Sequence, residues 1–244
     1  MRSARTFRYL ILTILLSVSA ASAFDHEYTE YAGLLQKFVS NGRVDYAALA
    51  QDRQPLDRFL SECSQVSFEE YKTFSRARQI CFMVNLYNAS AIALVLGSYP
   101  LQSIQDMEGM FTSPWNRRTV SLFEHKVGLG HIQHDIIRPE FKEPRLHFVL
   151  SITALGGPDL SNKPYLPDKL EQQLIEAERK FMTERPQENY FADGTMHLSE
   201  LFKWYPDDFG GQPGILQLVQ RYFPNAKPES NVVFTDFDWS LNSK

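Results

Sequence analysis

The stretch that decides the fold is residues 82–89, Phe-Met-Val-Asn-Leu-Tyr-Asn-Ala, inside an almost wholly apolar segment from Cys81 to Leu96. A helix this apolar is typical of the centre of a core, buried on most sides. Asn85 and Asn88 interrupt it three residues apart, on one face of the helix. A buried amide is costly unless it is hydrogen bonded. We therefore expect polar partners opposite this face, with Tyr87 lying beside the two asparagines.

Arg145 and His147 are candidate partners for the asparagines. The run that begins at His147 predicts a β-strand, whose alternation would put the two side chains on one face. A strand-borne histidine facing a helix resembles the layout of papain-like and transglutaminase-like folds. We expect Asn85, Asn88 and His147 in one buried cluster, completed by Arg145 or His134. The simpler interpretation is a buried histidine held by an asparagine amide.

The rest of the chain alternates short helices with short strands. Helical spacing of apolar residues predicts helices, and apolar runs bounded by turn residues predict strands. The expected helices are residues 28–38, 45–50, 55–63, a helix capped by Ser67, 81–96, 130–138, 167–179 and 214–223. The expected strands are residues 119–123, 147–153, 190–191, 195–198 and 231–236. The turn residues Ala192-Asp193-Gly194 predict a hairpin of 190–191 and 195–198. This pattern indicates an α+β fold, a helix-rich single domain with a small β-sheet.

Residues 1–23 have the features of a signal peptide. A basic leader with three arginines precedes a short apolar run, and Ala21-Ser22-Ala23 supplies the small residues of a cleavage site. The apolar run is short for a membrane span, so an uncleaved anchor fits less well. We expect export to the periplasm or the medium, a mature domain of residues 24–244, and no stable membrane insertion after cleavage.

The formal net charge is −4, and removal of the basic leader makes the mature chain more acidic. A negative chain argues against nucleic acid and against a polybasic membrane surface as partners. The expected partner is an envelope ligand or protein whose identity the sequence does not give.

Cys63 and Cys81 are the two cysteines of the chain. In an oxidising compartment two lone cysteines usually pair, and this disulfide would close a loop of about 18 residues, worth about 3 kcal/mol. Two inert buried thiols are the first alternative. The second makes Cys81 a nucleophile, because it lies near a helix start where the dipole lowers a thiol pKa.

Six segments, in order, resemble one bacterial and plant family, the domain of unknown function 547. They span about residues 41–242 and are Asn41-Gly42-Arg43-Val44-Asp45-Tyr46, residues 82–89, Ile132-Gln133-His134-Asp135-Ile136-Ile137-Arg138, Arg145-Leu146-His147-Phe148, Phe202-Lys203-Trp204-Tyr205 with Asp208-Phe209, and Asp238-Trp239-Ser240-Leu241-Asn242. Because the activity of this family is unsettled, the resemblance implies a fold more than a function.

The chain departs from the family pattern at two places. Gln133 stands where the family commonly has Glu, and residues 151–158 replace a family segment that contains two cysteines. If the first of those cysteines is a nucleophile, Ile152 at its position implies an inactive enzyme. If the two form a structural pair, their joint loss leaves any chemistry intact. This interpretation is favoured because cysteines in oxidising compartments usually pair with each other.

The remaining polar motifs give weaker indications. His131 and His134 have a spacing compatible with metal binding, but no further ligand stands nearby, so we expect no metal and no cofactor. Trp204 and Asp208 belong to an acidic and aromatic cluster that suits carbohydrate binding. A structural role, with Asp208 capping a helix or pairing with Arg145 or Arg138, suits the cluster better.

These features favour an exported cell-envelope protein with a binding or accessory role and without classical cysteine catalysis. The alternative is a hydrolase or transferase acting on peptide or envelope polymer. His147 would then be the general base, with Asn85 or Asn88 orienting it or stabilising an oxyanion. His134 is the fourth residue expected in this catalytic group. Arg145, Tyr87, Trp204 and Asp208 are the expected binding residues. Whether the protein is an enzyme stays open at this stage.

Overall fold

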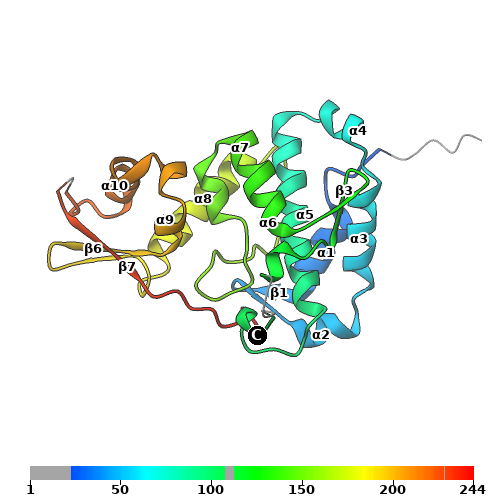
Figure 1. Cartoon of the computed structure of the whole chain (residues 1–244), viewed down its shortest axis with the longest axis horizontal. Helices are drawn as coiled ribbons and strands as arrows, with labels where there is room; N and C mark the ends of the chain where they lie inside the picture. Colours follow the sequence, from blue (N-terminus) through cyan, green and yellow to red (C-terminus); the bar gives the residue numbers. More distant parts are fainter. Residues whose placement is uncertain (1–22, 108–112, 228) are drawn as a thin grey trace, which may run out of the picture.

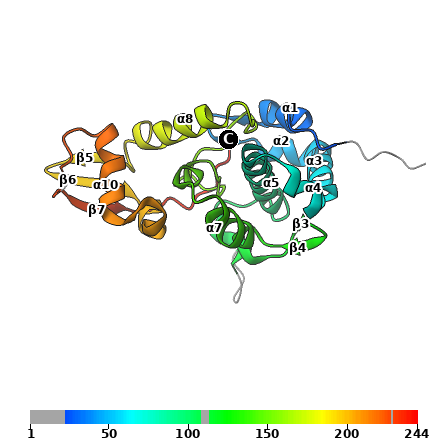
Figure 2. The ribbon, with the colours of Figure 1, turned by 90° about the horizontal axis from the view of Figure 1, so that it is seen from above.

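The computed structural model describes residues 23–107, 113–227 and 229–244. The predicted signal peptide lies outside these residues except for Ala23. Within them the fold is α+β and rich in helices, as the sequence predicts, and it has two lobes with a hydrophobic cluster each (Figure 1). Seen from above, helix α8 and the C-terminal segment connect the two lobes (Figure 2).

Helix α5 (Arg76–Leu96) forms the centre of the first lobe. It begins five residues before the expected start, because the Ser75 side chain accepts a hydrogen bond from the Arg78 amide and caps the helix. Among the described residues, α5 is the helix that is long and apolar enough to span a membrane, but 83% of its most apolar window is buried inside the protein. This burial is that of a core helix.

Short elements surround α5 in the first lobe. The helices are α1 (Thr29–Phe38), α2 (Tyr46–Gln51), α3 (Gln54–Gln65), α4 (Phe68–Thr73) and the 3-10 helices η1 (Ile104–Met107) and η2 (Pro114–Asn116). Two antiparallel hairpins pair β1 (Val39–Ser40) with β2 (Arg43–Val44), and β3 (Val120–Leu122) with β4 (His125–Val127). The predicted Ser67 cap of α4 is confirmed by its hydrogen bond from the Glu70 amide.

A continuous helical segment and one turn of 3-10 helix cover the side of the first lobe that faces the second. The segment consists of α6 (Leu129–His131), a π-helical stretch η3 (Ile132–Ile137) and α7 (Arg138–Phe141). The strand expected at 147–153 is wrong, because His147 lies in the 3-10 helix η4 (Pro144–Phe148). Pro144 near its start and the Glu143 side chain, which accepts the Arg145 amide hydrogen, favour this turn over a strand.

The second lobe follows helix α8 (Leu170–Thr183). Its three-stranded sheet has the order β5 (Tyr190–Ala192), β6 (Thr195–Ser199) and β7 (Asn231–Thr235), with β6 and β7 parallel. The helices α9 (Leu201–Trp204), η5 (Pro206–Phe209) and α10 (Gly211–Tyr222) complete the lobe. Asp193 and Gly194, both with positive φ, form the predicted turn between β5 and β6.

The C-terminal segment returns from the second lobe to the first. It makes β-bridges at three points, Ser103 with Ser240, Ala154 with Leu241 and Val44 with Ser243. At its end the buried Asn242 accepts a hydrogen bond of 2.9 Å from the Tyr46 hydroxyl. The return places residues that lie far apart in the sequence on opposite walls of one space between the lobes.

Candidate functional site

The two asparagines of α5 bind backbone groups. The Asn85 amide donates to the Tyr165 carbonyl and accepts from the Tyr165 amide, both at 2.9 Å. The Asn88 amide donates to the Val149 carbonyl and accepts from the Ser151 amide, also at 2.9 Å. Polar partners opposite this helix face therefore exist, as expected, but they are main-chain groups and not the His147 ring. A catalytic role for either asparagine stays a prediction.

His147 instead contacts the second lobe. Its Nε2 atom lies 2.6 Å from Asp208 Oδ2, and its ring stacks on the Tyr205 ring at 4.2 Å. Arg138 holds the same carboxylate from the other side, with Nε 2.6 Å and an Nη 3.0 Å from its two oxygens. The suggestion that Asp208 pairs with Arg138 is confirmed. We call His147, Asp208 and Arg138 the closed contact between the lobes.

Burial and charge set the protonation of the closed contact. Burial lowers the pKa of His147 and outweighs the opposite effect of its hydrogen bond to Asp208. Burial alone would raise the pKa of Asp208, but the hydrogen bonds from Arg138 and His147 lower it. Because a carboxylate only accepts, a neutral His147 donates its Nε2 hydrogen to Asp208.

A line of hydrogen bonds joins the core of the first lobe to the closed contact. The Trp115 indole N–H donates to the Tyr87 hydroxyl at 3.0 Å, and this hydroxyl donates to Gln133 Oε1 at 3.2 Å. Gln133 Nε2 in turn donates to the Tyr205 hydroxyl at 3.2 Å. Tyr87, a predicted binding residue, is 0% exposed, and its hydroxyl is hydrogen bonded within the protein. The Gln133 amide accepts one of these hydrogen bonds and donates the other. An ionised Glu at this position could accept but not donate.

The other predicted site residues lie apart from one another. His134 reaches Arg138 at 3.2 Å, at the rim of the closed contact. Arg145 forms ion pairs with Glu143 and Glu171 and does not join the His147 cluster. Trp204 packs in a cluster of half-buried rings with its partners Phe237 and Trp239.

The predicted disulfide is wrong. Cys63 and Cys81 are free, buried thiols. Burial raises the pKa of Cys81 to about 12, and it raises that of Cys63 as well. A thiol with a raised pKa is a poor nucleophile at neutral pH, so the structure favours the alternative of two inert buried thiols. Both occupy the apolar core of the first lobe, where a thiol packs as a small hydrophobic side chain.

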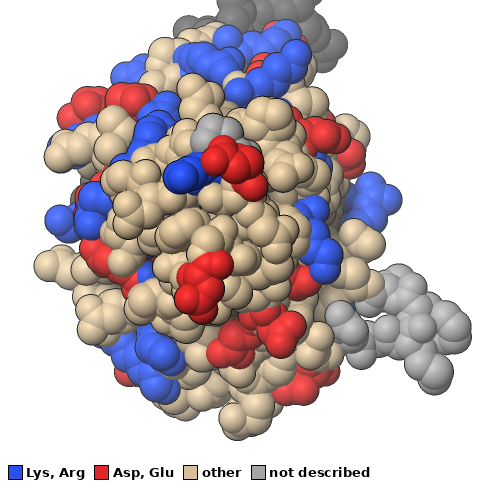
Figure 3. Space-filling model, turned by 90° about the vertical axis from the view of Figure 1, so that its left-hand side faces the viewer, with Lys and Arg blue, Asp and Glu red and all other residues tan. Residues whose placement is uncertain are grey.

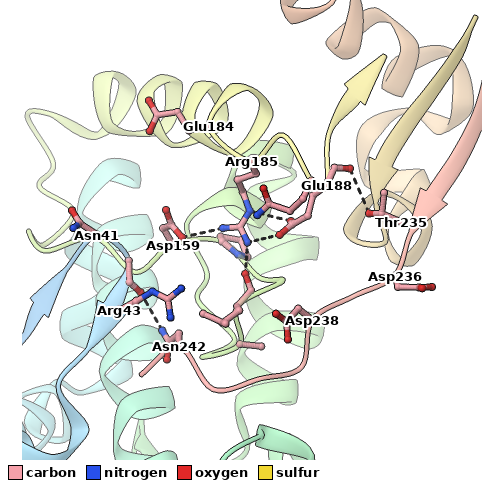
Figure 4. Close-up of a pocket in the computed structure, with 15 residues that line it drawn as sticks. Asn41, Arg43, Asp159, Glu184, Arg185, Glu188, Thr235, Asp236, Asp238 and Asn242 are labelled. Atoms are coloured by element: carbon pink, nitrogen blue, oxygen red, sulfur yellow. Dashed lines mark hydrogen bonds and ion pairs between the residues drawn. The ribbon is translucent and has the colours of Figure 1, made fainter. Parts of the chain in front are cut away.

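An open groove of about 550 Å³ lies between the lobes (Figure 4). We call it the interlobe groove, and its walls include Asn41, Arg43, Asp159, Arg185, Asp238 and Asn242. Sequence reasoning missed it, although Arg43 and Asp238 stand in motifs quoted above for the family resemblance. In the described part of the chain, no three His, Cys, Asp or Glu residues are grouped to hold a metal ion.

Two arginines of the groove differ in their partners. Arg185 is buried and bound by Glu188 at 2.7 Å, by Asp159 at 2.9 Å and by the Leu155 carbonyl. Arg43 is exposed, and its guanidinium donates one bond of 3.3 Å to the Ser243 carbonyl. The arginine of one wall is therefore neutralised, whereas the other keeps donors for a ligand.

Residues 71–182 match the family described as "Protein of unknown function, DUF547". The match supports the family resemblance over the central part of the chain, which carries both asparagines of α5, Gln133 and His147. No curated protein and no solved structure matches the chain.

Proposed function

We propose that this protein binds short peptides with free ends in the interlobe groove. The observation that carries the proposal is the position of Arg43 and Asp238, which reach into the groove from opposite walls (Figure 4). Among the described residues neither makes an ion pair. One positive and one negative group, held apart and both solvated, suit a ligand that carries both a carboxylate and an ammonium group.

The chemistry of the two side chains fits such a ligand. A guanidinium binds a carboxylate through two parallel hydrogen bonds, and a carboxylate accepts the donors of an ammonium group. Asn41 and Gln187 line the same groove and offer amides for a peptide backbone. The volume lies within the usual range of small-ligand sites. A second hollow of about 770 Å³ shares Asn41, Asp159 and Arg185 with the groove, so a peptide has room to extend.

We propose further that the protein works in the cell envelope or outside the cell. The support is the composition of residues 1–23, with its basic leader, apolar run and Ala21-Ser22-Ala23 site. N-terminal sequencing of the exported fraction is expected to begin at Phe24. A mature protein that retains the leader arginines would contradict export with cleavage.

A hydrolase or transferase that uses His147 as general base is the second candidate. The 2.6 Å contact with Asp208 favours it, because a carboxylate commonly orients a catalytic histidine. Against it, His147 is 5% exposed and its ring is covered by Tyr205 and Phe209. Incubation with tri-alanine, followed by chromatography of the products, separates the two candidates. Cleavage that His147→Gln abolishes would favour the enzyme.

Titration calorimetry with tri-alanine tests the binding proposal. The wild type is expected to bind the free peptide more tightly than the N-acetylated or C-amidated forms. Because a hydrogen bond to a charged group is worth about 1.5–3 kcal/mol, Arg43→Gln and Asp238→Asn are each expected to weaken binding roughly tenfold or more. Arg78→Gln, at an exposed arginine outside the groove, is the matched control. Equal binding of free and blocked peptides would contradict the proposal.

A further inference from the structure

A second cavity of about 490 Å³ lies in the first lobe, between α3, α5 and the hairpin of β3 and β4. These elements are neighbours in both ribbon views (Figures 1 and 2). Residues spaced by three or four along each helix form its two long walls, which include Leu60, Ser61 and Ser64 of α3 and Leu86, Ser90 and Leu94 of α5. The two helices leave this space unfilled by their own side chains.

The hydroxyl of Ser90 points to a ligand in this α3–α5 cavity. Ser90 is 5% exposed, and its Oγ atom has no hydrogen-bond partner among the described residues. A buried hydroxyl without a partner costs free energy. Ser90 lines the cavity, so a polar atom of a bound molecule would satisfy the hydroxyl that the protein leaves unpaired.

The rest of the lining combines apolar, hydroxyl and mostly cationic side chains. Leu86 and Val120, both buried, supply an apolar floor. Three cationic residues line the cavity together with a single acidic one, and the acidic residue is already paired with Arg53 at 2.9 Å. Arg117 and Lys126 have no carboxylate partner among the described residues; Arg117 donates to the Met107 carbonyl, and Lys126 is exposed. A locally positive cavity on a chain of net charge −4 favours an anion.

We propose that the α3–α5 cavity binds a small amphipathic anion, a single short hydrocarbon chain with a carboxylate or phosphate head. The head lies at Lys126 and Arg117, where water and the cations stabilise its charge. The chain lies along Leu86 and Val120, where its burial removes apolar surface from water. The Ser90 hydroxyl donates one hydrogen bond to an oxygen of the head. This site is separate from the interlobe groove, with which it shares no lining residue.

Titration calorimetry on the full chain tests the site with octanoate, octyl phosphate, octanol and butanoate. Octanoate or octyl phosphate is expected to bind, and the tighter of the two identifies the head group. Octanol is expected to bind more weakly, because it lacks the charge. Affinity is expected to fall about fourfold for each methylene group removed between octanoate and butanoate.

Three variants locate the binding. Lys126→Gln is expected to weaken anion binding roughly fivefold, and Lys227→Gln, at an exposed lysine outside the cavity, is the matched control. Ser61→Phe is expected to block the mouth of the cavity and abolish anion binding without unfolding the chain, because Ser61 is exposed. Ser90→Ala is expected to weaken binding without lowering the melting temperature, because it removes an unpaired hydroxyl.

Three results would overturn the proposal. The first is the failure of both octanoate and octyl phosphate to bind. The second is binding that is independent of chain length. The third is binding that Ser61→Phe and Lys126→Gln leave unchanged.

Discussion

The two sides of the junction between the lobes differ in how their charges are satisfied. On the closed side, the Asp208 carboxylate is shared between Arg138 and His147 at 2.6 Å, and no charge is left over for a ligand. On the open side, Arg43 and Asp238 face a groove without an ion pair among the described residues. The closed side thus holds the lobes together, whereas the open side has charged side chains that can bind a ligand.

Surface charge elsewhere is less informative than this contrast. The face of the second lobe in Figure 3 carries basic and acidic side chains interspersed with broad uncharged areas. Such a mixed surface gives no electrostatic indication of a partner. The difference between paired and unpaired charges at the junction is therefore the better guide to function.

The segment that runs from His147 to Leu155 connects the closed side to the wall of the groove, and Asn88 holds its middle. Asn88→Leu keeps a similar volume but leaves the Val149 carbonyl and the Ser151 amide without their partner. We expect the free energy of unfolding in urea to fall by about 3 kcal/mol. Asn231→Leu, at an exposed strand end, is the control and is expected to change it little. Equal stability of the two variants would show that the hydrogen bonds of Asn88 do not stabilise this segment.

The closed contact is expected to contribute somewhat less. Asp208→Asn removes the charge that Arg138 and His147 share, and we expect a loss of about 2 kcal/mol in the free energy of unfolding. Asp207→Asn changes the adjacent, exposed carboxylate and serves as the control. If both variants unfold at the same urea concentration, the contact does not stabilise the junction.

The pH dependence of stability should reflect the same contact. The pKa of His147 is lower in the folded chain than in the unfolded chain. The unfolded chain therefore binds more protons, and the free energy of unfolding decreases as the pH falls below about 6.5. The lowered pKa of Asp208 adds a loss at more acidic pH, as that carboxylate becomes protonated. His26 and His134 also have lowered pKa values and act in the same direction. Urea unfolding at pH 7 and pH 5 should therefore show a smaller difference for His147→Gln than for the wild type. An unchanged difference would mean that His147 is equally protonated in both states.

The sequence predicted those parts of the fold that depend on local chemistry. A long, almost wholly apolar segment located α5, a serine cap located the start of α4, and the turn at Asp193 and Gly194 located the β5–β6 hairpin. The strand expected at His147 was wrong because its apolar residues suggested alternation, whereas Pro144 and the Glu143 side chain favour a 3-10 turn.

The candidate site was harder to predict because it depends on contacts between distant segments. The sequence singled out His147 and Asp208, but the ring stacking of His147 on Tyr205 and the hydrogen bonds of Gln133 arise only when the two lobes meet. The groove likewise forms only when the C-terminal segment returns to the first lobe and brings Asp238 opposite Arg43.

The most direct test of the contrast is titration of tri-alanine into three variants whose folding is checked by circular dichroism. Asp238→Asn and Arg43→Gln alter the open side, and His147→Gln alters the closed side. We expect the two groove variants to lose binding roughly tenfold or more and His147→Gln to bind like the wild type. Binding that survives in both groove variants, or that is lost only in His147→Gln, would contradict the account.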